Sequence, residues 1–319
     1  MQPSPTPFDI ETWFAERTFA AGQFDPDELA TIKAGEDVSV SVVLPARNES
    51  ATIGGVIDAV MSLAGNLVDE VVVLDGGSSD DTQRVAADHG ARVHTDIGVF
   101  PDLGRGLGKG DALWRSLAVT SGDIVAFIDT DIRNPDPRFV SGLLGPLLTE
   151  PDVELVKAFY DRPVELDGVM HASGGGRVTE LLARPLLNLF WPELAGLVQP
   201  LSGEYAGRRT LLESIPFLTG YGVEIGMLID TLRLRGAGAI AQVDVQQRIH
   251  RNQPLEALSR MAFGVAQAAL RRLPEADRAQ LGDLPTAYRQ FVRDDDGTVG
   301  MSEAQAIAIV ERPPMGSRR

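Results

Sequence analysis

The chain has 319 residues, of which 44% are hydrophobic and 23% charged, and it contains no cysteine. This composition is typical of globular proteins, and the length accommodates about two domains. The absence of cysteine excludes disulfides, thiolate metal sites and cysteine nucleophiles, and it favours a reducing cytoplasm. The net charge of -16 disfavours nucleic acid and anionic lipid as partners, so a phosphorylated substrate would require a local cluster of basic side chains.

The first residues lack the basic and apolar segments of a signal peptide, so we expect the protein to remain inside the cell. The most apolar long stretch, 181–201, is interrupted by charged residues and prolines, whereas a membrane span requires about 20 mainly apolar residues. We expect this stretch to form a buried helix with a loop, or a subunit interface.

Hydrophobic periodicity predicts alternating strands and helices after an N-terminal arm at 1–37, which contains a short helix at 27–33. Apolar runs predict strands at 38–44, 68–74, 91–94, 123–128, 154–160 and 239–248. Amphipathic stretches predict helices at 51–63 (capped by Ser50), 81–89, 109–120, 177–190, 223–234 and 255–273. The chain is thereby divided after the arm into a regular half at 38–150, a less regular half at 151–275 and a C-terminal tail at 276–319.

Strands that are apolar throughout and alternate with helices indicate an α/β fold, with a parallel sheet covered on both faces. Ligands of such sheets bind at the carboxyl ends of the strands. In this chain the strand ends at 47–49, 75 and 129–131 all carry polar or acidic residues. We therefore expect the functional site at this edge of the sheet.

The Asp-x-Asp motif Asp129-Thr130-Asp131 directly follows the predicted strand at 123–128. Its carboxylates would project near one point, and hard oxygen ligands of this kind suit Mg²⁺ or Mn²⁺, which share their coordination with substrate phosphates. The motif predicts a metal site. The alternative is that the two aspartates only form a turn and cap a helix.

The first predicted strand runs into the turn Pro45-Ala46-Arg47-Asn48-Glu49. Asn48 offers a donor and an acceptor and Glu49 an acceptor, so this turn could recognise the edge of a base or ribose. Asp75, at the end of the next strand, is a candidate for a hydrogen bond to a uracil or guanine ring. The alternative is that these residues only cap the helices that follow.

Lys109 stands between two glycines ahead of a predicted helix, as expected of a base that binds phosphate. The segment is not a P-loop, because no Ser or Thr follows the lysine. Its alternative interpretation is a mobile loop.

The most distinctive stretch of the second half is the glycine run at 174–176 followed by Arg177-Val178-Thr179. Glycines allow backbone N–H groups to approach a ligand, a helix start carries partial positive charge, and Arg177 can bind an oxyanion with two hydrogen bonds. These features predict an anion site that includes Gly176, Val178 and Thr179. A flexible hinge is the alternative.

The strand predicted at 239–248 leads to Arg248-Ile249-His250-Arg251-Asn252, and strand alternation would place Arg248, His250 and Asn252 on one side. The Asp-x-Asp motif requires further ligands, so we interpret His250 as a metal ligand; the alternative is a structural histidine. The other histidines, His89, His94 and His171, have no comparable neighbours in sequence and are expected to be surface or structural residues.

Taken together, these residues resemble the A-type glycosyltransferases, and more closely the glucosyl-3-phosphoglycerate synthase family, over about residues 38–273. The resemblance rests on several long motifs: VVLPA at 42–46, GKG at 108–110, LWRSLA at 113–118, GGGRVTEL at 174–181, QPLSGEY at 199–205, GYGVEIG at 220–226 and HRN at 250–252. The chain departs from the family pattern at Arg47, Gly76 and Thr130. These three positions bear on which nucleotide sugar serves as the donor.

The resemblance implies a Rossmann-like nucleotide-sugar half, a mixed α/β acceptor half and transfer of glucose from UDP-glucose to the 2-hydroxyl of 3-phosphoglycerate with retention of configuration. It assigns Asp131, Glu224 and Thr179 to catalysis and Asp131 and His250 to Mg²⁺ or Mn²⁺. It assigns the donor to Pro45, Ala46, Arg47, Asn48, Glu49, Asp75, Lys109, Asp129, Thr130, Tyr221, Gly222, Val223 and Glu224. It assigns 3-phosphoglycerate to Gly176, Arg177, Val178, Thr179, Arg248 and Asn252. With the apolar segment at 186–201, it also favours a homodimer.

Four other functions remain open at this point. Close relatives in this family use GDP-mannose or GDP-glucose and form mannosyl-3-phosphoglycerate. A nucleotidyltransferase that makes nucleotide sugars would carry a glycine-rich first turn, where this chain has Pro45-Ala46-Arg47. A polyprenyl-phosphate glycosyltransferase would need a membrane anchor, and a non-catalytic nucleotide-sugar sensor would not need the Asp-x-Asp motif.

Overall fold

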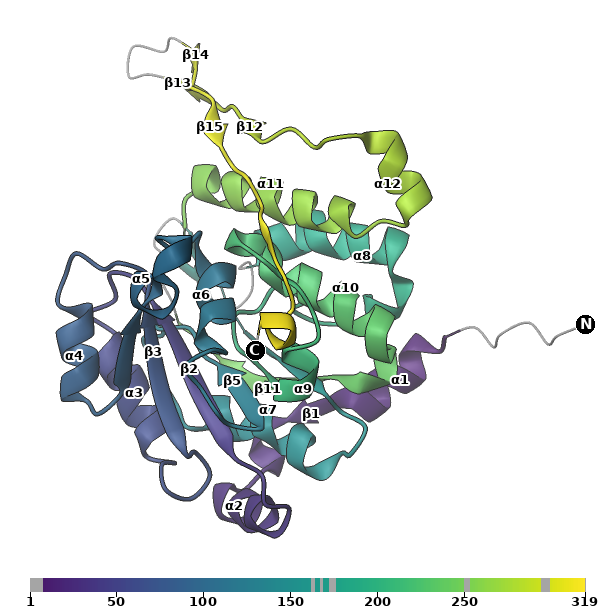
Figure 1. The fold of residues 1–319 in the computed structure, drawn as a ribbon. Coiled ribbons are helices and arrows are strands. Elements are labelled where there is room, and N and C mark those ends of the chain that lie inside the picture. Colours follow the sequence, from purple (N-terminus) through teal and green to yellow (C-terminus); the bar gives the residue numbers. More distant parts are fainter. Residues whose placement is uncertain are drawn as a thin grey trace, which may run out of the picture.

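The computed structural model describes residues 8–161, 164–166, 169–171, 176–249, 253–293 and 299–318. At its centre lies an eight-stranded sheet with helices on both faces (Figure 1). In spatial order the strands are β1 (Thr18–Ala20), β11 (Ile240–Gln247), β6 (Leu155–Asp161), β9 (Tyr205–Arg208), β5 (Ile124–Phe127), β2 (Val40–Ala46), β3 (Glu70–Asp75) and β4 (Arg92–Thr95).

The sheet is mixed, which corrects the expectation of a parallel one. Strand β9 runs antiparallel to both of its neighbours, β5 and β6, whereas the other adjacent pairs are parallel. Its short sequence, Tyr-Ala-Gly-Arg, lacks the apolar run from which strands can be predicted. Because β9 lies in the middle of the sheet, strands from both halves of the chain form one continuous layer.

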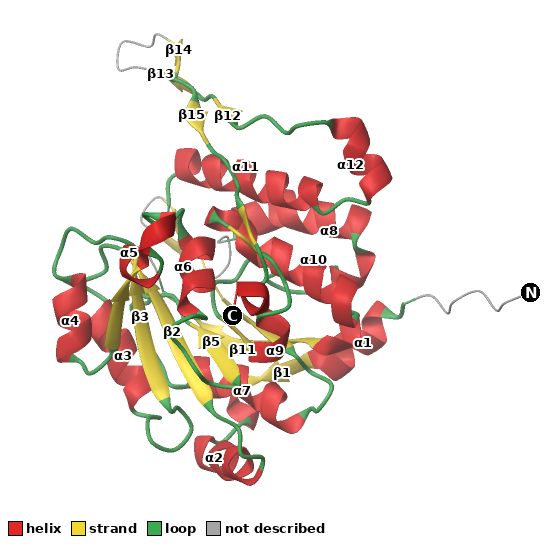
Figure 2. Cartoon of the chain, in the orientation of Figure 1, coloured by secondary structure: helices red, strands yellow, loops and turns green. Residues whose placement is uncertain are grey.

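Helices lie on both faces of this sheet (Figure 2), and a hydrophobic core fills the space on each face. Alternation along β2 sends Val42 into one core and Val43 into the other. Helices α3 and α7 contribute to the first core, and α6, α10 and α11 to the second. The strands are therefore buried on both sides, which explains their continuous apolar sequences.

Most helices lie within a few residues of the predicted ranges. Five helices, α1, α5, α7, α9 and α12, were not predicted; in α7, Pro146 and two glycines interrupt the pattern. Ser50 does not cap α3, whose N-cap is Thr52. The helices are α1 (Ile10–Arg17), α2 (Pro26–Gly35), α3 (Ile53–Met61), α4 (Thr82–Asp88), α5 (Asp96–Val99), α6 (Lys109–Ser116), α7 (Arg138–Thr149), α8 (Arg184–Phe190), α9 (Arg209–Leu212), α10 (Val223–Arg235), α11 (Leu255–Arg271) and α12 (Glu275–Leu281). Single turns are η1 (Ala21–Gln23), η2 (Pro101–Leu103), the π-helical η3 (Thr179–Ala183), η4 (Pro192–Leu194), η5 (Gly220–Gly222), η6 (Ala237–Ala239) and η7 (Met315–Arg318).

Parts of the predicted N-terminal arm and of the predicted C-terminal tail pack into the body of the protein. In the N-terminal arm, β1 forms the edge of the sheet and the buried Trp13 donates its indole N–H to the carbonyl of Ala237 at 2.9 Å. At the other end the chain crosses the body, shown in yellow in Figure 1, and β16 (Glu311–Arg312) pairs with β10 (Phe217–Leu218). Ile309 and Met315 are buried in the second core.

The remaining strands form short antiparallel pairs. They are β7 (Val164–Leu166) with β8 (Val169–His171), β12 (Ala287–Tyr288) with β15 (Gln305–Ala306), and β13 (Phe291–Arg293) with β14 (Val299–Met301). In the described part of the chain, no helix has the length and apolar character that crossing a membrane requires.

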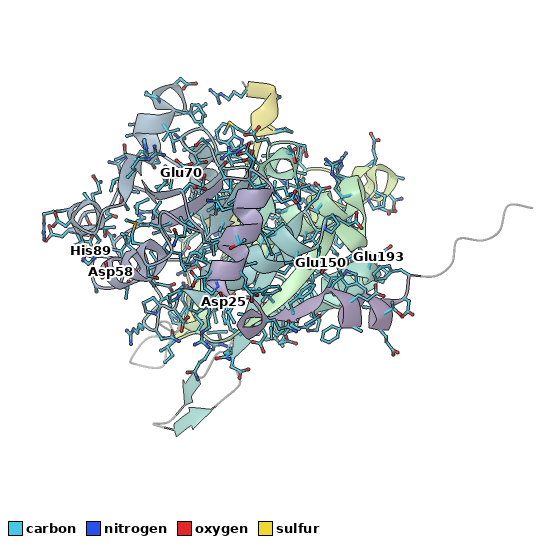
Figure 3. The ribbon with its side chains drawn as sticks, turned by 90° about the horizontal axis from the view of Figure 1, so that it is seen from below. Asp25, Asp58, Glu70, His89, Glu150 and Glu193 are labelled. Atoms are coloured by element: carbon cyan, nitrogen blue, oxygen red, sulfur yellow. The ribbon has the colours of Figure 1, made fainter. Side chains whose placement is uncertain are left out.

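Strand β11 ends earlier than predicted. Its register with β6 shifts between Asp244 and Gln247, and Gln246 has a φ of 73°, so simple alternation does not continue to Arg248. His250 and Asn252, which that alternation was to place, lie outside the described residues. His89 is a surface residue beside Asp58, whose carboxylate lies 2.6 Å from its Nδ1 (Figure 3).

Candidate active site

A cavity of about 620 Å³ opens at the carboxyl ends of β2 and β5. It lies where α/β sheets bind their ligands, as the sequence predicts. Of the residues assigned to the site, those that line it are Pro45, Ala46, Arg47, Glu49, Lys109, Asp129, Thr130, Asp131, Gly176, Arg177, Val178, Thr179, Tyr221, Glu224 and Arg248. Among the described residues, Asn48, Asp75, Gly222 and Val223 are not part of this lining.

Asn48 joins the two turns that follow β2 and β3. Its φ is 58°, in the left-handed region that Asn tolerates better than most residues. Its side-chain oxygen accepts a hydrogen bond from the backbone N–H of Ser79 at 2.8 Å, and its own N–H donates to the Ser78 hydroxyl at 2.8 Å. These contacts hold Arg47 and Glu49 at the cavity wall.

Asp75 and Thr130 also make local contacts. Asp75 is fully buried and accepts hydrogen bonds from the N–H groups of Gly77 and Ser78 and from the Gln83 amide. The Thr130 hydroxyl donates to the carbonyl of Pro45 at 3.0 Å, which fastens the Asp-x-Asp turn to the end of β2. Their assignment to the donor remains a prediction, and the contacts observed support a role in shaping the turns.

Lys109 lies at the start of α6, with its ammonium group between two carboxylates. Its Nζ lies 2.5 Å from Asp129 Oδ1 and 3.3 Å from Glu224 Oε1. The flanking glycines are needed for this approach, because Gly108 has a φ of 93° and a Cβ on Gly110 would overlap the carbonyl of Leu218. Burial alone would lower the pKa of Lys109, but Asp129 and Glu224 hold it well above its ordinary value, so the side chain stays charged.

Arg248 contacts both aspartates of the Asp-x-Asp motif. Its Nη2 donates to Asp131 Oδ1 at 2.5 Å and to Asp129 Oδ2 at 3.1 Å. The guanidinium therefore lies on the carboxylate side of the cavity, and the assignment of Arg248 to the acceptor remains a prediction. Burial raises the pKa of Asp131, while the positive charge of Arg248 opposes that shift.

A tight turn before β9 closes this side of the cavity. Leu201 and Gly203 line it, and a Cβ on Gly203 would overlap both Asp129 Oδ2 and Lys109 Nζ. Lys157 holds this turn in place, because its buried Nζ donates to the carbonyl of Ser202 at 2.5 Å. Burial lowers the pKa of Lys157 to about 7.

The cavity lining also includes residues that were assigned to the acceptor and the sugar. Arg177 donates to the carbonyl of Gln253 at 3.1 Å, and Thr179 begins the π-helical turn η3. Turns of this type occur frequently at functional sites. Tyr221 in η5 is 47% exposed, whereas Glu224, in the first turn of α10, is buried.

The carboxylates fit a hard divalent cation. Asp129 and Asp131 present oxygen ligands at the cavity, and the pKa of the neighbouring Glu49 is raised by burial and by the negative charge of Asp131. Within the described ranges, no group of three or more His, Asp or Glu side chains has the geometry of a metal site. The predicted ligand His250 lies outside those ranges, so its role remains a prediction.

Comparison with known proteins identifies the family. Residues 41–219, more than half of the chain, match the model of glycosyl transferase family 2. The chain belongs to this family of glycosyltransferases, and its A-type fold agrees with the fold that the sequence motifs imply.

Two curated relatives cover nearly the whole chain. Glucosyl-3-phosphoglycerate synthase of Mycobacterium tuberculosis is 50% identical over 295 residues, which are 90% of this chain and 88% of that protein. The protein of the same name from Mycolicibacterium smegmatis is 46% identical over 308 residues, which are 96% and 98% of the two chains.

Solved structures show the same likeness. The mannosyl-3-phosphoglycerate synthase of Rubrobacter xylanophilus superimposes with a TM-score of 0.89 at 44% identity, covering 98% of this chain and 99% of that one. The M. tuberculosis glucosyl-3-phosphoglycerate synthase crystallised with Mn²⁺, UDP-glucose and phosphoglyceric acid gives 0.80 at 48% identity, covering 93% and 96%.

Several lining residues were not assigned from the sequence. Gly203 is part of the QPLSGEY motif that contributed to the resemblance, but nothing in that motif indicates its contact with Asp129. The apolar residues Leu258, Met261 and Val265 of α11 line the cavity as well. Their helical spacing is indistinguishable in sequence from that of core residues.

Proposed function

We propose that this chain transfers glucose from UDP-glucose to the 2-hydroxyl of 3-phosphoglycerate with retention of configuration. One juxtaposition supports this most strongly: a single cavity joins the Asp-x-Asp motif and Lys109 to Arg177 and Thr179. The first group of residues suits a nucleotide diphosphate with its cation, and the second suits a phosphorylated acceptor. Relatives that are 46% and 50% identical over 96% and 90% of this chain carry the corresponding name.

In this proposal Asp131, with His250 as a second predicted ligand, holds Mg²⁺ or Mn²⁺, which when bound neutralises the charge that develops on the leaving diphosphate. Lys109 keeps Asp129 and Glu224 in place through its two ion pairs. Glu224 is then positioned to orient the hydroxyls of the sugar. Arg177 and the Thr179 turn hold the acceptor with its 2-hydroxyl toward the anomeric carbon.

In this proposal, retention results from attack on the face that the diphosphate leaves, and not from two successive inversions through a covalent intermediate. We infer that the leaving phosphate oxygen takes the proton of the acceptor hydroxyl, so that no side chain forms a covalent bond to the sugar. The C–O bond to UDP breaks as the bond to the acceptor oxygen forms, and the products are UDP and glucosyl-3-phosphoglycerate.

The second candidate is transfer of mannose from GDP-mannose, or use of both GDP-mannose and GDP-glucose. The TM-score of 0.89 with the R. xylanophilus mannosyl-3-phosphoglycerate synthase favours it, as does Arg47 at the wall of the cavity. Thermal shift with UDP-glucose and with GDP-mannose, each with and without Mg²⁺, separates the two. We expect a larger shift with UDP-glucose, and a shift with GDP-mannose alone would favour the second candidate.

Arg177→Ala is expected to raise the KM for 3-phosphoglycerate about ten- to a hundredfold, because a charge-assisted hydrogen bond contributes about 1.5–3 kcal/mol. The affinity for UDP should stay the same. Steady-state kinetics with each substrate varied in turn measures both effects. Arg184→Ala is the matched control, since Arg184 pairs with Glu180 outside the cavity. Equal use of unphosphorylated glycerate by the wild type would contradict this assignment.

We further propose that the enzyme is a cytoplasmic homodimer. The cytoplasm is supported by the absence of cysteine and by the phosphorylated acceptor. A dimer is supported by apolar side chains that stand in solvent along η3 and α8: Leu181 is 79% exposed and Leu189 is 73% exposed.

Leu189→Glu is expected to convert the dimer to a monomer, because a charge would have to be buried in an apolar contact. Light scattering coupled to gel filtration gives the mass of each species. Leu234→Glu, on the exposed side of α10, should leave the dimer intact. A wild type that runs as a monomer at all concentrations would refute the dimer.

A further inference from the structure

Arg248 contacts two residues behind the cavity lining as well as two residues that line the cavity. It is 4% exposed, and its Nη2 bridges Asp129 and Asp131. Its Nε lies 3.0 Å from Glu204 Oε1, an ion pair without the alignment of a hydrogen bond, and its Nη1 donates to the Tyr160 hydroxyl at 3.3 Å. Each nitrogen of the planar guanidinium therefore has its own partner, which fixes the orientation of the whole group.

Glu204 contacts Arg248 from behind the cavity lining and does not itself line the cavity. It is fully buried, and its Oε2 accepts a hydrogen bond from the Tyr160 hydroxyl at 2.6 Å. Its backbone carbonyl accepts from the N–H of Ala158 at 3.0 Å, so it is held against β6 through both main chain and side chain. A buried carboxylate held in this way cannot turn toward a substrate. Its ion pair is with Arg248.

The charges explain why such an anchor matters. A guanidinium held between two carboxylates competes with any cation that uses the same oxygens, and the competition strengthens as the guanidinium moves toward them. Glu204 draws Arg248 away from the cavity and compensates its charge. Without it, a buried arginine would face Asp129 and Asp131 alone.

We propose that Glu204 is a positioning residue that, through Arg248, sets the two carboxylates of the Asp-x-Asp motif for a divalent cation. The role rests on the proposed function, since it presumes that this motif binds the cation. Glu204 itself touches neither substrate nor metal. Tyr160, which contacts both Glu204 and Arg248, belongs to the same support.

The test is Mn²⁺ titration in the presence of UDP, followed by the electron paramagnetic resonance signal of free Mn²⁺. Glu204→Gln keeps the shape of the side chain but removes its charge, and we expect it to weaken Mn²⁺ binding about tenfold, equivalent to about 1.4 kcal/mol. Tyr160→Phe removes one hydroxyl and should weaken binding about threefold. In turnover, kcat should fall for Glu204→Gln, and added Mn²⁺ should restore part of the lost rate.

Asp230→Asn is the matched control for a purely structural effect. Asp230 forms a largely buried ion pair with Arg272, at 2.8 Å, and lies outside the cavity. Asp230→Asn should lower the melting temperature and leave Mn²⁺ affinity unchanged.

Mn²⁺ affinity of folded Glu204→Gln within twofold of wild type would overturn the inference. If Glu204→Gln does not fold, unchanged affinity in Tyr160→Phe would overturn it in the same way. A wild type that fails to bind Mn²⁺ with UDP would instead overturn the proposed function itself, and the inference with it.

Discussion

Asp131→Ala should reduce turnover by at least about a hundredfold while the fold persists, because it removes a cation ligand from a site whose catalysis is mainly electrostatic stabilisation. Asp131 lies at the cavity with one oxygen on Arg248, so the substitution also releases that guanidinium toward Asp129. Initial rates at saturating UDP-glucose and 3-phosphoglycerate measure the loss.

Asp136→Ala is the control for this substitution. Asp136 follows in the same loop, pairs with Arg138 and does not line the cavity, so its loss should leave the rate within about twofold of wild type. The same assay with excess EDTA tests the cation directly. Full activity of Asp131→Ala, or of the wild type in EDTA, would show that no cation acts through this residue.

Gly203→Ala should lower turnover by a comparable factor for a steric reason. The added methyl group would overlap Asp129 Oδ2 and Lys109 Nζ, so it must displace one or both of the side chains whose ion pair joins Lys109 Nζ to Asp129 Oδ1. Overpacking of this kind costs about 1–3 kcal/mol of stability, and a displacement of about 1 Å at a reacting centre can cost a hundredfold in rate. Melting temperature and kcat, measured together, separate the two effects.

Gly238→Ala is the control for Gly203→Ala, because it adds the same methyl group at a position where there is room for it. A Cβ on Gly238 meets no atom within 4 Å, and the residue lies in η6, which does not line the cavity. Both its melting temperature and its kcat should match those of wild type. An active Gly203→Ala enzyme with unchanged kcat would mean that the contact between Lys109 and Asp129 is not needed for turnover.

The position of the site could be predicted from the sequence, because it depends on local pattern. The apolar runs that become β2, β3 and β5 each end in polar residues, and parallel strands bring those ends to one edge. The pairing of Lys109 with Asp129 and Glu224 could not be predicted, since it depends on how α6 and α10 pack together on one face of the sheet. The close approach of Gly203 has the same origin.

Arg248 shows how a local irregularity limits what strand alternation can predict. The register shift between Asp244 and Gln247 and the positive φ of Gln246 interrupt the regular strand before Arg248, so alternation alone does not determine which side Arg248 faces. Strand β16 near the C-terminus could not be predicted for a different reason. Its pairing with β10 joins residues about ninety positions apart, and such contacts leave no periodic signal in a single sequence.

The most direct test of the account is to identify the product by nuclear magnetic resonance. The purified protein is incubated with UDP-glucose, 3-phosphoglycerate and Mn²⁺, and the reaction is compared with one in which GDP-mannose replaces UDP-glucose. We predict that UDP-glucose gives one equivalent of UDP and a glucosyl-3-phosphoglycerate linked through the 2-oxygen in the α configuration. A β-linked product, free glucose alone, or a product formed only from GDP-mannose would contradict the account.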